Sequence, residues 1–414
     1  MKSLIDARLR AVCARSTRPL RVVYADGSET RHGPAAAAPE FALRFRTAAA
    51  QRRAVLFGHI GLLDGYFDGE LDIEGDLAAL FALGFEAGFS QPSPLVRLRN
   101  RWHEFTRNNA NWQRAKDNAR FHYGLGADFY RYWLDRELMM YTCAYWSEGT
   151  ATVEQAQVNK VEHVCRKVLL APGETVIDIG CGFGGFMFHA AKHHGARVTG
   201  LNTTTEQVEW LRDEIVRRGL GAQLDVREAD FRDVDRQYDK VVSIGVLEHA
   251  GRDQIDEVVK AHADFLKPGG LGMLHFIGHV GQYPTEFFIR DHVFPGGWIP
   301  SLTETLDAMD RYGLEIIDIE NLRRHYVLTL EAWAERFDAH WDDIHRLNPA
   351  RFDERFRRIW RTYLVGCAEM FRAGNGITGL YQITFGKGRR TPKTYPMSRA
   401  FLHERPAPRE SGSD

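Results

Sequence analysis

A run of glycines gives the clearest chemical signal in this sequence. Residues 176–185 read Val-Ile-Asp-Ile-Gly-Cys-Gly-Phe-Gly-Gly, which places Gly180, Gly182 and Gly184 at alternate positions. Glycine lets the backbone turn sharply and approach a ligand without a Cβ in the way. A helix that begins after such a turn offers free N–H groups to an anionic or polar ligand. The spacing is G-x-G-x-G rather than the G-x-G-x-x-G of dinucleotide-binding sites. A plain tight turn is the competing interpretation, so the surrounding elements must decide.

The residues around these glycines alternate between strand and helix patterns. A buried strand precedes them, further strands are predicted over 197–201, 239–244 and 270–276, and helices over 205–218 and 254–266. A run of threonines is expected to cap the first helix, and Lys-Pro-Gly-Gly to end the second. Strands separated by helices form a parallel sheet with right-handed crossovers, and such sheets bind ligands at the carboxyl ends of their strands. That edge would gather 180–184, 202–204, Asp230, Glu248 and 275–277.

Composition limits the classes of partner and compartment. The 414 residues are 44% hydrophobic and carry a formal net charge of −1, so no overall field favours nucleic acid or a membrane. The five cysteines are scattered and form no Cys-x-x-Cys pair, which indicates a reducing compartment with neither disulfides nor zinc. No stretch of about 18 apolar residues predicts a membrane span. Charged residues near the N-terminus interrupt any apolar core of a signal peptide.

Four segments are predicted along the chain. Residues 1–90 form a small α+β domain with a strand–turn–strand pattern around Asp26-Gly27. Residues 91–120 hold a linker and a basic helix with aromatic residues at helical spacing. That helix is either a connector with a solvated face or a surface for anionic lipid headgroups. Residues 121–390 form the catalytic domain, and the tail 391–414, rich in Pro, Ser and charge, is expected to be disordered.

Several short motifs follow one another in order between residues 120 and 387. They read Tyr-Thr-Cys-Ala-Tyr-Trp at 141–146, the glycine segment at 177–185, Gly-Val-Leu-Glu-His at 245–249, Leu-His-Phe-Ile-Gly at 274–278 and Phe-Pro-Gly-Gly-Trp-Ile-Pro-Ser at 294–301. Together they resemble the motifs of the cyclopropane-fatty-acyl-phospholipid synthase family of S-adenosylmethionine-dependent enzymes, which has the mycolic acid cyclopropane synthases as relatives. Three positions depart mildly from the family pattern, because Ala127, Thr142 and Phe183 stand where Asn, Ser and Trp are usual.

The resemblance implies an α/β architecture, the Rossmann-like fold of class I S-adenosylmethionine-dependent methyltransferases, preceded by a small N-terminal α+β domain that handles lipid. It implies transfer of a methylene group to the cis double bond of an unsaturated phospholipid acyl chain, which forms a cyclopropane fatty acid. Alkene attack on the sulfonium methyl leaves a carbocation, and the new methyl loses a proton as the ring closes. Such a site needs a dry channel, walls that tolerate a cation and one held base.

In the family the base is a bicarbonate ion, and the resemblance assigns its cage to five residues. They are Cys143, Glu248, His275, Tyr326 and the backbone of Ile277. A carboxylate beside an anion is unfavourable unless a proton is shared, so Glu248 and the ion would titrate as a coupled pair. Taken alone, each of these side chains could equally be a core or capping residue. His249 is expected to point elsewhere, and Cys367 to be buried packing without a nucleophilic role.

S-adenosylmethionine would occupy the carboxyl edge of the sheet. The expected contacts are Gly180, Gly182 and Gly184 for the methionine moiety, Asn202, Thr203 and Thr204 for the ribose, Asp230 and Phe231 for the adenine, and Gln207 and Tyr141 in addition. No metal ion is expected among the cofactors.

Two alternatives stay open at this stage. The same carbocation could lose a different proton and leave a methyl-branched or methylene-substituted chain. A lipid-binding protein without catalysis is the alternative from another class, although Glu248, His275 and the glycines are all retained. The expected partners are membrane phospholipid acyl chains, reached by peripheral contact with the inner face of the membrane from the cytoplasm. No nucleic acid is expected, and a homodimer is the assembly that we consider.

Overall fold

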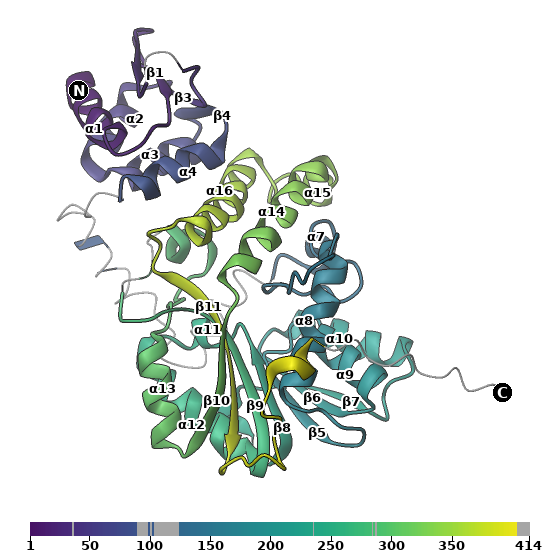
Figure 1. Ribbon diagram of the computed structural model, residues 1–414. Coiled ribbons are helices and arrows are strands. Elements are labelled where there is room, and N and C mark those ends of the chain that lie inside the picture. Colours follow the sequence, from purple (N-terminus) through teal and green to yellow (C-terminus); the bar gives the residue numbers. More distant parts are fainter. Residues whose placement is uncertain are drawn as a thin grey trace.

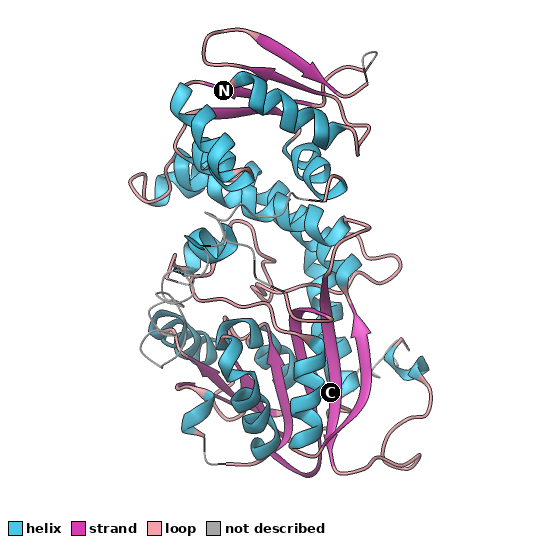
Figure 2. Ribbon diagram, turned by 90° about the vertical axis from the view of Figure 1, so that its left-hand side faces the viewer, coloured by secondary structure: helices cyan, strands magenta, loops and turns pink. Residues whose placement is uncertain are grey.

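The computed structural model describes residues 1–34, 37–88, 98–99, 102, 124–234, 236–283, 285 and 288–403. Two sheets lie at opposite ends of the molecule with a helical layer between them, as both ribbon views show (Figures 1 and 2). The small sheet belongs to the first 75 residues, and the large one to residues 175–387.

The large sheet has seven strands. They are β5 (Thr175–Ile179), β6 (Arg197–Asn202), β7 (Leu224–Glu228), β8 (Tyr238–Ile244), β9 (Leu266–His279), β10 (Leu314–Asn321) and β11 (Thr378–Lys387). Their spatial order is β10-β11-β9-β8-β5-β6-β7. The five strands from β9 to β7 are parallel, and β11 enters antiparallel between β9 and β10. The predicted parallel sheet is therefore confirmed for β5, β6, β8 and β9, whereas no range was predicted for β7, β10 and β11.

The side chains of the central strands alternate between the two faces of the large sheet, and each face carries a hydrophobic core. Val176 packs with the buried residues of α8 (Val153–Lys167), α9 (Gly185–His194) and α10 (Thr205–Arg217). Its neighbour Ile177 packs with α12 (Ile255–Phe265) and α13 (Leu302–Arg311) instead. Successive side chains of a strand point to opposite faces, so the two sets of helices cover opposite faces.

The small sheet has the order β2-β1-β3-β4. Its strands are β1 (Leu20–Val23), β2 (Glu29–His32), β3 (Phe41–Phe45) and β4 (Leu71–Gly75), accompanied by α1 (Lys2–Cys13), α2 (Ala48–Phe57), α3 (His59–Phe67) and α4 (Leu77–Glu86). The predicted turn at Asp26-Gly27 joins β1 to β2, and Gly27 adopts the left-handed φ of 81° that this tight turn requires.

The helical layer joins the two sheets. It is formed by α14 (Arg323–Ala339), α15 (Trp341–Leu347) and α16 (Glu354–Arg372), with the short α7 (Ala127–Arg131) beside it. One hydrophobic cluster runs from the small sheet through α14 and α16. At the junction the Arg358 guanidinium of α16 donates to the carbonyls of Tyr66 and Leu71 and pairs with Asp72.

The structure differs from the sequence predictions at two boundaries. Helix α12 ends at Phe265, as predicted to within one residue, but the Lys-Pro-Gly-Gly segment after it belongs to β9, which begins at Leu266 rather than at the predicted residue 270. Residues 391–403 of the tail are described and include a short 3₁₀ helix, η4 (Arg399–Leu402), in which Leu402 is buried.

Most of the predicted basic helix lies outside the described residues, which include only Leu98, Arg99 and Trp102 of it; residues 404–414 also lie outside. Of the helices in the described ranges, none has the length and apolar character needed to cross a bilayer.

Candidate active site

A cavity opens at the carboxyl ends of β5, β6, β7 and β8, at the edge where the parallel topology predicts a ligand. Nine of the ten expected cofactor contacts line it: Tyr141, Gly180, Gly182, Asn202, Thr203, Thr204, Gln207, Asp230 and Phe231. The topology thus brings together residues up to 90 positions apart in the chain, and their role in cofactor binding stays a prediction.

The glycines of the first turn serve three different purposes. Gly180 has a φ of 72°, and a Cβ on it would lie 2.2 Å from Cγ2 of Val246, so this glycine is required by packing. Gly182 also has a left-handed φ, of 54°, but a Cβ there would meet no atom within 4 Å. At Gly182 the missing side chain therefore keeps open the space beside the cavity wall.

Gly184 is the one expected cofactor contact that is not among the residues that line the cavity. It is the N-cap of α9 with a φ of 77°, and a Cβ on it would lie 2.4 Å from Cδ2 of Leu211 and 3.0 Å from Cε2 of Phe188. Its role is to begin the helix and to let α10 pack closely against it.

Asn202 ties the glycine turn to the next helix. Its Nδ2 donates to the carbonyl of Gly182 at 3.1 Å and to Oε1 of Gln207 at 3.0 Å, and its Oδ1 accepts from the backbone N–H of Thr204 at 2.9 Å. The expected threonine cap is wrong in detail, since Thr204 is the N-cap residue of α10 but its side chain makes no capping bond.

Asp230 is held by a neighbour that the sequence analysis did not single out. Its carboxylate accepts from the backbone N–H and the guanidinium of Arg232, at 2.6 Å for the Nε contact. Arg232 also lies over the ring of Phe231, 5.1 Å from the centroid, and lines the cavity itself. The adenine end of the expected site therefore combines an acid, an aromatic ring and a cation.

Aromatic side chains lie behind Tyr141. The aromatic wall consists of Tyr141, Phe294, Tyr326, Trp333 and Tyr363. The Tyr141 hydroxyl donates to Tyr363 Oη at 2.9 Å, and the Tyr141 ring lies 5.3 Å from Trp333 and 6.4 Å from Phe294. Because the faces of aromatic rings carry negative charge, such a wall tolerates a positive charge while excluding water.

None of the five predicted cage residues lines the cofactor cavity. Cys143, His275 and Tyr326 are buried, whereas Glu248 and Ile277 are partly buried. Glu248 stands in the single turn of α11 (Leu247–Ala250), and its Oε1 accepts from the backbone N–H of Ile277 at 2.6 Å. Its Oε2 is buried and has no hydrogen-bond partner among the described residues. Burial raises the pKa of the Glu248 carboxyl to about 7.

His275 is fully buried on β9. Its Nδ1 accepts from Nε2 of Gln382 on β11 at 3.1 Å, so the ring proton stands on Nε2. This Nε2 has no partner in the described part of the chain. Burial holds the pKa of the His275 imidazole well below its usual value, so the ring is neutral.

Cys143 and Tyr326 are also buried and uncharged. The Cys143 thiol donates to the carbonyl of Ala144 at 3.3 Å and approaches that of Leu322 at 3.9 Å. Burial raises the pKa of both side chains, and the neighbouring Tyr363, Cys143 and Glu248 raise that of Tyr326 further. Among the five cage residues, the hydrogen bonds of the described chain join only Glu248 and Ile277.

His249 was expected to point elsewhere, and this is wrong, because it lines the cavity and its ring lies 5.5 Å from that of Phe294. Burial lowers the pKa of its imidazole to about 4. The one-turn helix α11 turns residues 248 and 249 toward different neighbours, and no sequence signal predicted this short helix.

Two buried charged residues support the cavity wall and were also missed. Asp135 accepts from the backbone N–H groups of Leu138, Met139 and Met140, and this fixes the segment before Tyr141. Lys160 of α8, with no exposed surface, donates to the hydroxyl of Thr142 at 2.8 Å. Burial lowers the pKa of the Lys160 ammonium to about 8 and raises that of the Asp135 carboxyl to about 6.

Comparison with known proteins identifies the family to which this chain belongs. The family described as mycolic acid cyclopropane synthetase matches residues 110–383, and a domain of unknown function matches residues 10–91. A probable fatty acid methyltransferase of Pseudomonas putida is 37% identical over 262 residues, which are 61% of this chain and 65% of that protein. The cyclopropane-fatty-acyl-phospholipid synthase of Escherichia coli (strain K12) is 31% identical over 344 residues, 81% of this chain and 85% of that protein.

A solved structure shows the same fold. The mycolic acid cyclopropane synthase CmaA1, complexed with SAH and CTAB, superposes with a TM-score of 0.60 at 29% identity and covers 65% of this chain and 97% of its own. The expected class I S-adenosylmethionine-dependent methyltransferase fold is thereby confirmed.

Proposed function

The chain belongs to the mycolic acid cyclopropane synthetase family, and from this premise we propose that it transfers a methylene group from S-adenosylmethionine to the cis double bond of an unsaturated phospholipid acyl chain. The product is a cyclopropane fatty acid. A relative that carries the name cyclopropane-fatty-acyl-phospholipid synthase, matched over 81% of this chain, supports the phospholipid as substrate.

The cavity fits S-adenosylmethionine. Gly182 leaves open space where a side chain would stand, the Asn202 network fixes the turn that would hold the methionine moiety, and Asp230 with Phe231 would hold the adenine. When bound, this cofactor supplies an electrophilic sulfonium methyl. Tyr141 borders both the cavity and the aromatic wall, so we place the double bond along that wall, where water is excluded and a cation is tolerated.

The observation that carries the proposal is that two residues of the predicted cage each bury a polar atom without a partner. Glu248 Oε2 and His275 Nε2 are both buried, and neither has a partner among the residues that the structure describes. Burying a polar atom without a partner costs free energy, so both atoms would be explained by a small polar ligand that binds to them.

A small oxyanion suits these two atoms. The neutral His275 offers an N–H donor, and Glu248, whose pKa burial raises to about 7, offers an O–H donor when it is protonated. Bicarbonate, when bound there, supplies a base for the proton released on ring closure. The residues would orient the ion through these donors and through the Ile277 backbone, which holds Glu248 in place.

A methylated, unclosed product is the second candidate. The Pseudomonas putida relative, a probable fatty acid methyltransferase, favours this product. In that reaction the residues would perform the same methyl transfer, but a different proton would leave the chain.

The test is lipid analysis of bacteria that lack cyclopropane fatty acids and express this chain. We expect unsaturated phospholipid acyl chains to gain the mass of one methylene group and to show cyclopropane ring protons by NMR. The same mass gain without ring protons would favour the methylated product. No gain, with the protein folded and present, would leave the lipid-binding alternative.

A further inference from the structure

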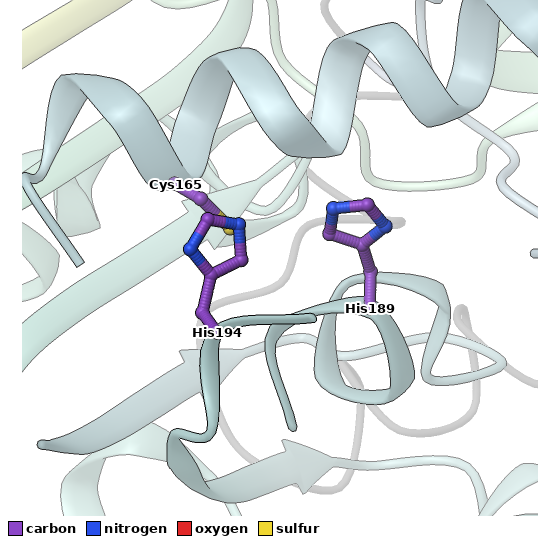
Figure 3. Close-up of side chains that lie close together, drawn as sticks. All are labelled: Cys165, His189 and His194. Atoms are coloured by element: carbon purple, nitrogen blue, oxygen red, sulfur yellow. The ribbon is translucent and has the colours of Figure 1, made fainter. Parts of the chain in front are cut away.

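A second cluster of reactive side chains lies outside the catalytic region, between α8 and α9 (Figure 3). It consists of Cys165, His189 and His194, whose ligand atoms lie within 4.8 Å of one another. The glycine turn starts α9 at the cavity, whereas His194 is the last residue of this helix. At 1.5 Å per residue, His189 lies about 6 Å and His194 about 13 Å along the helix from its first residue, Gly185.

We propose that this cluster, together with Glu162, is a binding site for a zinc ion. Oε2 of Glu162 lies 3.1 Å from Nε2 of His189 and 2.9 Å from Nε2 of His194, so both imidazoles converge on one carboxylate oxygen. One sulfur, two imidazole nitrogens and one carboxylate oxygen form a four-ligand set of the kind that Zn²⁺ prefers.

The spacing of the ligands follows from the two helices. Glu162 and Cys165 are three residues apart on α8, so they share a face of that helix. His189, at the middle of α9, and His194, at its end, reach toward that face. Ligand atoms around a tetrahedral zinc stand roughly 3.3 to 3.7 Å apart. The Cys165 sulfur and the two imidazole nitrogens, within 4.8 Å of one another, need only small side-chain movements to close around an ion. Glu162 contacts both imidazoles and would move with them to become the fourth ligand.

Neighbouring contacts orient the ligands. Nε of Arg166 donates to Oε1 of Glu162 at 2.9 Å, which leaves Oε2 to face the histidines. Arg166 also donates to the carbonyl of Leu402, so the same guanidinium holds η4 against α8. Such outer contacts commonly fix the ligands of a metal site. Cys165 and His189 are buried, while His194 is half-buried and would give an ion its way in.

The sequence predicts no zinc site because its cysteines form no Cys-x-x-Cys pair. Here a single cysteine is supplemented by two histidines and a glutamate from a neighbouring turn and a second helix, and only the packing of α8 on α9 brings them together. The site would fasten α8 to α9, two of the helices that cover one face of the large sheet.

The experiment uses the full chain, stripped with a chelator and then dialysed against Zn²⁺ or Co²⁺. We expect one equivalent of zinc to be retained and the melting temperature to rise. The Co²⁺ protein should show tetrahedral d–d bands and a thiolate-to-cobalt charge-transfer band. Cys165→Ser should abolish that charge-transfer band while the protein still melts cooperatively.

Matched histidine variants locate the site. His189→Asn and His194→Gln should weaken zinc binding at least tenfold, whereas His340→Asn, at the end of α14, should bind like the parent. If the parent retains no zinc, or if His340→Asn loses it as the other variants do, the proposal is overturned. A Cys165→Ser variant with an unchanged cobalt spectrum would overturn it equally.

Discussion

At the residue scale, the most informative group is the half-satisfied carboxyl of Glu248. One oxygen is fixed by the Ile277 backbone and the other is buried without a partner in the described chain. The carboxyl is therefore held in one orientation with a free atom presented to a ligand, which is what a positioning or proton-sharing role requires.

Glu248→Gln should lower turnover by roughly two orders of magnitude or more, the scale of a lost acid–base group. S-adenosylmethionine affinity should stay within a few fold, because Glu248 does not line the cavity. Calorimetry and steady-state rates check this. Parallel loss of affinity and activity would place Glu248 at the cofactor instead.

The pH dependence gives a second test of the same residue. Its pKa is raised to about 7, so the proton that it would share with an anion is present below this value and lost above it. We expect activity on vesicles to fall as the pH rises through about 7, and this limb to be absent in Glu248→Gln. A rate that rises through the same range would make Glu248 itself the base.

A carbonate-free, degassed assay should be slow; full activity there would rule out bicarbonate.

Gly182 offers the sharpest test of the cofactor site. Gly182→Ala should weaken S-adenosylmethionine binding at least tenfold, because a methyl group would enter the space beside the cavity and the left-handed φ would be strained. Gly219→Ala is the control, since Gly219 also has a left-handed φ of 69° with open space around it but does not line the cavity. Both variants should lose about 1 to 2 kcal/mol of stability. Equal affinities in titration calorimetry would contradict the assignment.

At the element scale, the first parallel strands and the turns that follow them could be predicted from the sequence. The buried charged residues that support these turns could not. The buried runs of β5, β6 and β8, each followed by polar or glycine residues, are strong local signals. Asp135 and Lys160 carry no such signal, because a charged residue in a helix or loop is usually solvated. Their burial against the cavity wall follows only from tertiary packing.

The strands β10 and β11 were not predicted from the sequence, for a related reason. The pairing of β11 with β9 joins residues about 100 positions apart, so local patterns do not report it. β10 is only partly buried and carries several acids, which weakens its alternation. His275 depends on this pairing, since its partner Gln382 comes from β11.

The segment near Trp102 is the element that we expect to meet the lipid surface. Leu98 and Trp102 are 67% and 69% exposed, and they flank Arg99 in a predicted basic stretch. Leu98→Glu combined with Trp102→Glu should reduce sedimentation with anionic vesicles and activity on them, while activity on detergent-dispersed substrate survives. Val216→Glu, at an exposed apolar residue of α10, is the control. Unchanged sedimentation at low salt would return the segment to the role of a connector.

At the scale of the whole molecule, the N-terminal domain is joined to the catalytic part through α16. The half-buried Arg358 satisfies two backbone carbonyls and one carboxylate of that domain. Its loss would remove three contacts across the junction, although Asp72 would still pair with Arg46 and the Tyr66 carbonyl would still accept from the Gly69 N–H.

Arg358→Ala should therefore cost about 1 to 3 kcal/mol of stability and make the junction more sensitive to limited proteolysis. Arg346→Ala, which removes an exposed intrahelical pair, should be close to neutral. If both variants unfold and are cleaved like the parent, the junction does not depend on Arg358.

If Arg358→Ala keeps activity on dispersed lipid but loses it on vesicles, the N-terminal domain delivers the site to the membrane, as we propose.

The central claim, ring closure on a phospholipid acyl chain, is tested most directly with purified protein, vesicles of a cis-unsaturated phospholipid and S-adenosylmethionine carrying a trideuterated methyl group. We predict a phospholipid whose acyl chain has gained a fully deuterated ring methylene, with one deuterium lost to the base and cyclopropane signals in the NMR spectrum. A product that keeps the whole trideuterated methyl, or a lipid that remains unmodified while the protein binds the cofactor, would contradict the account.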